Sequence, residues 1–217
     1  MLKRVFGFAI FAICLAVLTA GLSTGGEKKK AKEKKDDPKY NNPTFVPTAD
    51  EVIEKMFEMA KVNKDDYMFD LGCGDNRICF MAAKKFRCRG VGLETNPVRI
   101  REAMDQFEKY NKNEAISTGG SISLPLVETR HGDALKVKDI GDATVVVLYM
   151  FPEFMELWFP IAQKHLKPGT RIVSHDYKWD YDAHPEMWKE TAVANVKSSS
   201  RDNHKVYLWI VPEKGKK

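Results

Sequence analysis

The chain has 217 residues, which is enough for one α/β domain with a complete core and too few for two domains of ordinary size. Hydrophobic residues make up 43% and charged residues 30% of the chain, as in soluble globular proteins. The formal net charge of +5 comes largely from a lysine run at residues 28–35, so the region after it is close to neutral and carries no basic stripe of the kind that binds nucleic acid.

The N-terminal residues 1–23 predict a signal peptide or a membrane anchor. An almost uninterrupted apolar run from residue 5 to residue 22 follows two basic residues. Small residues such as Ala20 and Ser23 suit a cleavage site, whereas the length of the run is close to that of a bilayer span. The lysines that follow the run outnumber the basic residues before it, which favours an anchored protein with its domain in the cytoplasm. Export after cleavage is the alternative.

Two charged segments flank the predicted domain, which covers residues 45–213. Residues 24–44 combine Gly, Pro, Lys, Glu and Asp with few apolar side chains, so we expect a flexible linker; contact of its lysines with anionic lipid is a second interpretation. Residues 214–217 form a short basic tail.

The four cysteines indicate neither a disulfide framework nor a metal site. Cys14 lies in the apolar N-terminus, while Cys73, Cys79 and Cys88 fall in one short stretch without the paired spacing of metal ligands. Free thiols are most common in a reducing compartment, which agrees with a cytoplasmic domain.

The first half of the domain alternates helices and strands. Thr48 and Glu51 have the spacing of a capping box that opens a helix. A strand over residues 67–71, a helix over 78–86 and a strand over 90–93 follow. Asn96 and Pro97 are typical of the N-cap and first position of a helix, which we expect to run to about Tyr110.

The second half continues the alternation. A third strand leads to residues 131–133, and the β-branched run at residues 143–149 is typical of a central strand covered on both faces. A helix over residues 152–166, a strand over 171–174 and a last strand over 206–211 follow, with 192–196 as a weaker candidate. The pattern predicts a doubly wound, mostly parallel sheet.

Acidic residues end three consecutive predicted strands, and a glycine turn follows the first of them. Asp70, Gly72 and Gly74 lie where the first strand gives way to a helix, the place where an open α/β sheet presents backbone N–H groups to a ligand. Glu94 ends the second strand, where a carboxylate can accept both ribose hydroxyls, and Asp133 follows the third strand near the expected adenine. The sequence therefore predicts a nucleoside site at this edge of the sheet.

This pattern resembles the class I S-adenosylmethionine (SAM) dependent methyltransferases, whose fold is a Rossmann-like, mostly parallel seven-stranded sheet flanked by helices. The stretches FVPTADEVIEKM, DLGCGDNRI, LYMFPE and LKPGTRIVSHDY are similar to bacterial relatives of the membrane-anchored mitochondrial protein-lysine methyltransferases. The resemblance implies SAM as cofactor, with Gly72 and Gly74 against its methionyl part, Asp70 helping to hold that end, Glu94 on the ribose and Asp133 beside the adenine. Asn76 departs from the glycine usual in that group, although asparagine tolerates a left-handed backbone.

The methyl acceptor is expected beyond the fourth strand, by the same resemblance. There Glu153 could guide an ammonium group, and Tyr149 or Phe151 could face a cation. The alternative is that Glu153 only favours a helix N-terminus and that the aromatic residues pack. For His175, at the end of the fifth strand, a structural role and a proton-handling role are both open.

We consider four functions for these residues. A methyltransferase acting on a protein lysine is the first, and a methyltransferase for a small-molecule acceptor is the second. An NAD-dependent oxidoreductase would share the glycine turn and Glu94, but its fingerprint requires a third glycine where Arg77 stands. A non-catalytic SAM-binding module is the fourth. No metal is required for methyl transfer, and nucleic acid is not an expected partner.

Overall fold

The computed structural model describes residues 45–117 and 126–213. Within these ranges, no helix has the length and apolarity needed to cross a bilayer. The predicted N-terminal anchor or signal peptide, the lysine-rich linker and the basic tail lie outside the described residues, so those predictions stay open.

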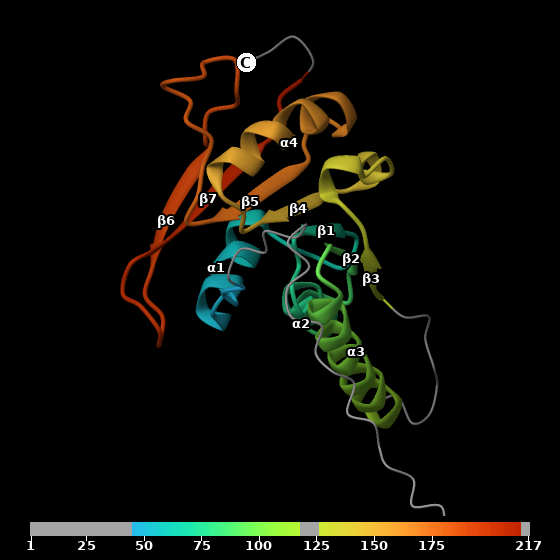
Figure 1. The fold of residues 1–217 in the computed structure, drawn as a ribbon. Helices are drawn as coiled ribbons and strands as arrows, with labels where there is room; N and C mark the ends of the chain where they lie inside the picture. Colours follow the sequence, from blue (N-terminus) through green and yellow to red (C-terminus); the bar gives the residue numbers. More distant parts are fainter. Residues whose placement is uncertain (1–44, 118–125, 214–217) are drawn as a thin grey trace, which may run out of the picture. The chain divides into compact units, whose positions relative to one another are not determined.

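The domain is built on one seven-stranded sheet with the order β3-β2-β1-β4-β5-β7-β6 (Figure 1). Its strands are β1 (Tyr67–Leu71), β2 (Arg89–Glu94), β3 (Val127–His131), β4 (Val145–Leu148), β5 (Arg171–His175), β6 (Ala192–Val196) and β7 (His204–Ile210). Strands β3, β2, β1, β4 and β5 pair in parallel, whereas β7 is antiparallel to both β5 and β6. The predicted mostly parallel seven-stranded sheet is therefore confirmed, including the weaker candidate strand β6.

The alternation of helices and strands is less strict than the sequence suggested. The helices are α1 (Asp50–Ala60), α2 (Arg77–Phe86), α3 (Pro97–Ser117) and α4 (Pro152–His165). Between β3 and β4 the chain forms only two short 3₁₀ turns, η1 (Ala134–Lys136) and η2 (Ile140–Asp142). Helix α3 begins as predicted, since Asn96 Oδ1 accepts the Val98 N–H at 2.8 Å, but it extends beyond Tyr110.

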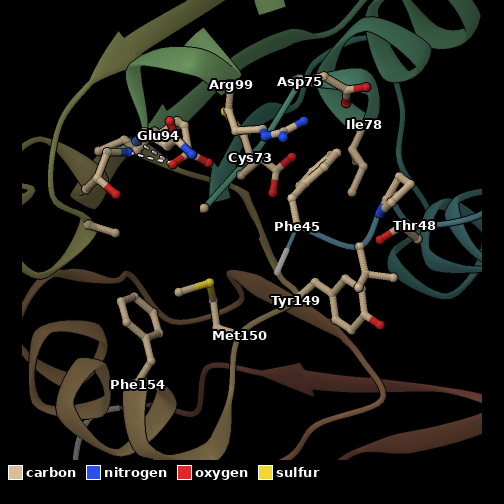
Figure 2. Close-up of a pocket in the computed structure, with 18 of the residues that line it drawn as sticks. Phe45, Thr48, Cys73, Asp75, Ile78, Glu94, Arg99, Tyr149, Met150 and Phe154 are labelled. Atoms are coloured by element: carbon tan, nitrogen blue, oxygen red, sulfur yellow. Dashed lines mark hydrogen bonds between the residues drawn. The ribbon is translucent and has the colours of Figure 1, made fainter. Parts of the chain in front are cut away.

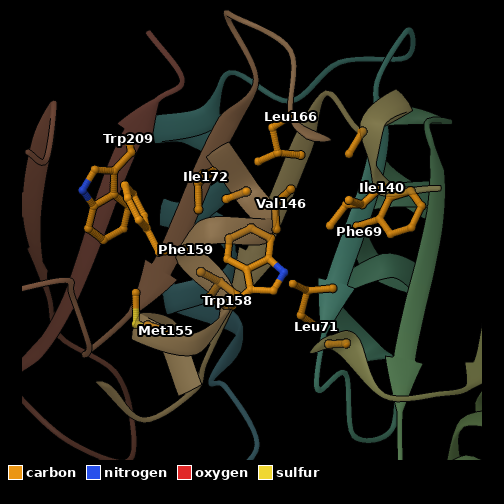
Figure 3. Close-up of a cluster of buried hydrophobic side chains, with 14 of the residues drawn as sticks. Phe69, Leu71, Ile140, Val146, Met155, Trp158, Phe159, Leu166, Ile172 and Trp209 are labelled. Atoms are coloured by element: carbon orange, nitrogen blue, oxygen red, sulfur yellow. The ribbon is translucent and has the colours of Figure 1, made fainter. Parts of the chain in front are cut away.

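Apolar side chains cover both faces of the sheet, as a doubly wound fold requires. On one face, α1 and α2 pack on strand residues such as Met68, Val145 and Val173. On the other face, α4 packs on Phe69, Val146 and their neighbours (Figure 3). Figure 1 shows α4 on the side of the sheet opposite α1 and α2. These two cores fix the sheet so that the carboxyl ends of the parallel strands β1 to β5 form one edge.

The capping box predicted for α1 is wrong. The N-cap residue is Ala49, and no side chain caps the helix. Glu51 Oε1 instead accepts the backbone N–H of Ser199 at 3.1 Å, and Thr48 Oγ1 lies 3.3 Å from His175 Nδ1. Tertiary partners far along the chain therefore take both side chains that local spacing had assigned to the cap.

Candidate functional site

A cavity of about 610 Å³ opens at the carboxyl ends of the parallel strands, within the size range of cofactor pockets (Figure 2). The ends of β1, β2, β3, β4 and β5 all contribute to it, with the segment before α1. Six of the residues predicted for the site or its rim line this cavity: Asp70, Gly72, Glu94, Asp133, Tyr149 and Phe151. The sheet thus brings together residues that are far apart in the sequence.

The turn after β1 has the backbone conformation that its glycines suggested. Gly72 and Gly74 have φ angles of +76° and +55°, in the region that side chains disfavour. Asn76 also has a positive φ of +59°, which confirms that asparagine is accommodated here. Its amide Nδ2 donates to the Glu128 carbonyl at 3.2 Å and to Thr129 Oγ1 at 2.8 Å, so the residue also ties the turn to β3.

Three backbone amides hold the Glu94 carboxylate in place. Oε2 accepts the Gly74 N–H at 2.9 Å, and Oε1 accepts the N–H groups of Thr95 and Asn96, each at 2.8 Å. Hydrogen bonds of this kind to an ionised carboxylate are among the stronger ones. Gly74 is not itself among the lining residues, but its N–H thereby orients a side chain that is.

Asp70 is buried without a hydrogen-bond partner for its Oδ2 atom among the described residues. Burial, followed by the nearby charges of Asp75 and Glu94, raises the pKa of Asp70 to about 8. Asp75 is paired with Arg77 through a two-pronged contact, with Arg77 Nη2 at 2.7 Å from Asp75 Oδ2. An unpartnered acid in a cavity fits a cationic ligand, because a positive charge would restore its ionised form.

Asp133 follows β3 and begins the η1 turn. Its Oδ1 accepts the Leu135 N–H at 2.9 Å, and Lys136 Nζ lies 3.2 Å from its other oxygen. The carboxylate is therefore fixed at the cavity rim on the β3 side, beyond Glu94 in the strand order.

The segment before α1 contributes a wall that the sequence did not reveal. A Cβ on Gly74 would lie 2.0 Å from Cε2 of Phe45, and a Cβ on Gly72 would lie 2.6 Å from Sδ of Met150. Both glycines are therefore covered by side chains, and Arg99 lies over the Phe45 ring at 4.6 Å (Figure 2). No local pattern in the sequence marks Phe45, because its contact depends on how the chain crosses the turn.

Aromatic residues line the cavity at the ends of β4 and β5. The ring of Tyr149 stacks on Tyr177 with centroids 6.0 Å apart, and Phe151 lies 5.3 Å from Tyr177. Tyr149 also contacts the His175 ring at 4.0 Å. Burial and the nearby Asp176 raise the pKa of Tyr149, so its phenol stays neutral. In contrast, Glu153 is exposed in the first turn of α4 and does not line the cavity.

The three buried cysteines, Cys73, Cys79 and Cys88, are free thiols, in agreement with the absence of a predicted disulfide framework. Burial raises the pKa of the Cys73 thiol well above its usual value. Cys73 lines the cavity as a neutral, apolar contact.

Comparisons with known proteins agree with this geometry. A model of the ANTKMT methyltransferase domain matches residues 70–186. A protein-lysine N-methyltransferase from Saccharolobus islandicus (strain REY15A) is 38% identical over 170 residues, covering 78% of this chain and 94% of the relative.

Solved structures point the same way. An RNA methyltransferase from Salinibacter ruber, in complex with S-adenosyl-L-homocysteine, superposes with a TM-score of 0.61 at 35% identity, covering 79% of this chain and 97% of that one. The N-methyltransferase NodS from Bradyrhizobium japonicum WM9 shares the fold, with a TM-score of 0.56 at 12% identity over 75% of this chain and 96% of that one.

The sheet order, the glycine turn and these relatives define a class I SAM-dependent methyltransferase, with SAM as the cofactor. The oxidoreductase interpretation is thereby set aside. Within that class, the chain belongs to the ANTKMT methyltransferase domain family.

Proposed function

We propose that the enzyme transfers the methyl group of SAM to the side-chain amine of a protein lysine. The observation that carries this proposal is the aromatic wall of Tyr149, Phe151 and Tyr177 on the acceptor side of the cavity. Aromatic faces attract an ammonium group and equally accommodate the methylated products. The two arginines of the lining do not repel such a substrate strongly, because Arg77 is paired with Asp75 and Arg99 with Glu102.

For the cofactor, we propose that Glu94 accepts the ribose hydroxyls and that Asp133 lies beside the adenine. Glu94 is already oriented by three backbone N–H groups, so little conformational freedom is lost when it binds a ligand. Asp70 would hold the methionyl end through the positive charge there. Because Phe45 and Met150 cover the two glycines, we expect the methionyl end to lie against these side chains as well as the turn.

Methyl transfer depends more on the alignment of the acceptor nitrogen, the methyl group and the sulfur of SAM than on a strong acid or base. SAM supplies the methyl group; a bond forms between it and the acceptor nitrogen while its bond to sulfur breaks, and S-adenosylhomocysteine leaves. The lysine nitrogen must first release its ammonium proton to solvent so that its lone pair is free. The residues of the chain bind and orient the two partners and exclude water, with Tyr149 packed on the acceptor side. We also propose that Glu153 guides the lysine ammonium group toward the cavity from its exposed position outside it.

The names of the relatives leave two macromolecular acceptors to distinguish, a protein lysine and RNA. The domain at residues 45–213 has 23 lysines and arginines against 26 aspartates and glutamates. A slight net negative charge does not favour a polyanion, whose binding depends on phosphate contacts. The charge and the aromatic wall together favour the lysine.

The test is to supply the full chain with deuterated-methyl SAM and two separate acceptor pools, a protein extract and total RNA, from cells that lack the enzyme. Tandem mass spectrometry should find label on lysine Nζ atoms and none in RNA nucleosides. A Glu94→Gln variant serves as the control, because its carboxylate is neutralised while its shape is kept. Label in nucleosides alone, or only in low-molecular-weight compounds, would refute the lysine proposal. Ligand binding without turnover on any pool would instead support a non-catalytic module.

We also propose that the protein is anchored by its N-terminus with the domain in the cytoplasm. The lysines after the apolar run support this orientation, and SAM is available there. Sequencing of the mature N-terminus and protease accessibility in intact cells test it. A cleaved N-terminus with an exported domain would refute it.

A further inference from the structure

A buried chain of hydrogen bonds leads from the cavity wall into the protein at the end of β5. Thr48 lines the cavity, and its Oγ1 lies 3.3 Å from His175 Nδ1. His175 Nε2 lies 2.8 Å from His204 Nδ1, and His204 Nε2 lies 2.8 Å from Ser198 Oγ. Thr48, His175, His204 and Ser198 are all buried.

Arg201 fixes the direction of this chain. Its Nη2 lies 2.9 Å from His204 Nδ1, and a guanidinium can only donate. His204 Nδ1 must therefore be an acceptor, which places the proton of His204 on Nε2, facing Ser198. The same Nδ1 atom faces His175 Nε2, so His175 must donate there and carry its proton on Nε2.

Asp176 strengthens this assignment. Its Oδ2 lies 3.4 Å from His175 Nε2 and also accepts from Arg201, so the acceptors around His175 Nε2 agree with a proton at that position. Burial lowers the pKa of His175 to about 4, and the charges of His204 and Arg201 act in the same direction, against the opposing charge of Asp176. His175 is therefore neutral at physiological pH and its Nδ1 is unprotonated, so it accepts the Thr48 hydroxyl proton.

We propose that Thr48 is a positioning residue whose hydroxyl, committed as a donor to His175, presents only lone pairs to the cavity and accepts an N–H of the methyl acceptor amine. The ordered chain Arg201, His204, His175, Thr48 sets this polarity. The inference rests on the proposed amine acceptor and adds the residue that orients it. With a pKa near 4, His175 is too weak a base to take the proton of an ammonium group, so its role is orientation.

The position of Thr48 in the fold favours the acceptor over the cofactor. Its partner His175 ends β5, and the ring of His175 packs on Tyr149 of the aromatic wall. The acidic residues and glycines proposed for the cofactor end or follow β1, β2 and β3, and β4 separates β1 from β5 in the sheet. Two strand spacings of about 4.8 Å each therefore separate Thr48's partner strand from β1.

The kinetic test compares Thr48→Val, which removes the hydroxyl but keeps the shape, with Thr48→Ser, which restores it. We expect Thr48→Val to lower kcat/KM for a lysine-containing acceptor roughly 10- to 100-fold, the effect of one hydrogen bond to a nitrogen that becomes positively charged in the transition state, with Thr48→Ser close to wild type. The Kd for SAM should change less than about threefold. Thr170→Val is the matched control, because Thr170 is equally buried and donates to the Ala143 carbonyl at 3.2 Å, at the opposite ends of the strands.

Nitrogen-15 NMR of the histidine rings tests the polarity itself, without any acceptor. His175 should be neutral with its proton on Nε2 at pH 7, and His204 should carry a proton on Nε2 with Nδ1 free to accept from Arg201; the signals are assigned with single histidine variants. In an Arg201→Met background, the effect of Thr48→Val on kcat/KM should shrink, because the ordering donor is gone.

Three results would overturn the inference: a proton on Nδ1 of His175, an unchanged kcat/KM in Thr48→Val, or a loss confined to SAM affinity. Failure of the lysine proposal would be visible separately, as absence of lysine methylation by the wild-type enzyme.

Discussion

Replacing Asp70 with a residue that cannot ionise should abolish the release of a proton from this position when SAM binds. With a pKa of about 8 in the free enzyme, Asp70 is largely protonated at pH 7. A bound cation favours the ionised carboxylate, so its pKa should fall on binding and a proton should leave. If the pKa falls below about 6, SAM affinity should rise up to tenfold per pH unit between pH 6 and pH 8, and about 0.9 proton should be released per SAM at pH 7.

Calorimetry in buffers of different ionisation enthalpy measures the released protons directly. The Asp70→Asn variant keeps the shape of the side chain and cannot ionise, so it should bind SAM more weakly at pH 8. Its remaining pH dependence is that of the ligand's own amino group, which makes it the control for the wild type. Equal proton release and equal pH slopes in the two proteins would refute the assignment of Asp70 to the cationic end of SAM.

Asp70 should also make the stability of the ligand-free protein fall with rising pH, in the opposite direction to SAM affinity. The folded-state pKa of Asp70 is above its value of 3.8 in the unfolded chain, so between these values the folded state holds a proton that the unfolded state has lost. Stability therefore falls as pH rises through this window, by about 2 to 3 kcal/mol between pH 5 and pH 7 as an upper limit. Asp70→Asn should remove this loss in denaturant titrations of the ligand-free protein. An unchanged pH profile would contradict the burial of an ionisable group here.

Other substitutions distinguish residues that determine SAM affinity from residues that only stabilise the fold. Gly74→Ala should abolish SAM binding and lower the melting temperature, because it adds a methyl group against Phe45 at a positive φ. Gly169 also has a positive φ but has nothing within 4 Å of the added methyl group. Gly169→Ala should therefore cost only about 1 kcal/mol of stability in denaturant titrations and leave SAM affinity unchanged. Glu94→Gln should weaken SAM binding roughly 10-fold or more in calorimetry, since an amide cannot accept from three backbone N–H groups and two ribose hydroxyls as a carboxylate does. Asp66→Ala, which removes the buried carboxylate that pairs with Arg171 at the other end of the strands, should cost about 3 to 5 kcal/mol of stability by denaturant titration with SAM affinity retained in the folded fraction. Equal SAM affinity in the Gly74 and Gly169 variants, or loss of affinity in folded Asp66→Ala, would contradict this division.

Much of the fold could be predicted because its signals are local. Apolar runs, the Asn96 cap and the glycine turn each depend on neighbouring residues, and the strands that they predicted are present. The reversed direction of β7 could not be predicted, because strand direction depends on how the chain returns to the sheet. The capping box failed for a related reason, since Thr48 found a partner 127 residues away.

The site residues that lie at the ends of strands could be predicted, because the sheet alone determines where they lie. Acids at the ends of neighbouring parallel strands must share one edge, and Asp70, Glu94 and Asp133 do line one cavity. Phe45 and Met150 were missed because their contacts with the glycines arise from packing between distant segments. Glu153 follows the fourth strand as expected but lies on the exposed first turn of α4.

A crystal structure of the full chain with S-adenosylhomocysteine tests the central claim, that the carboxyl ends of β1, β2 and β3 hold the cofactor. The ribose hydroxyls should lie within about 3 Å of the Glu94 carboxylate, the distance of a charge-assisted hydrogen bond, with the adenine on the Asp133 side. A ligand bound away from this edge, or a ribose that makes no contact with Glu94, would contradict the account.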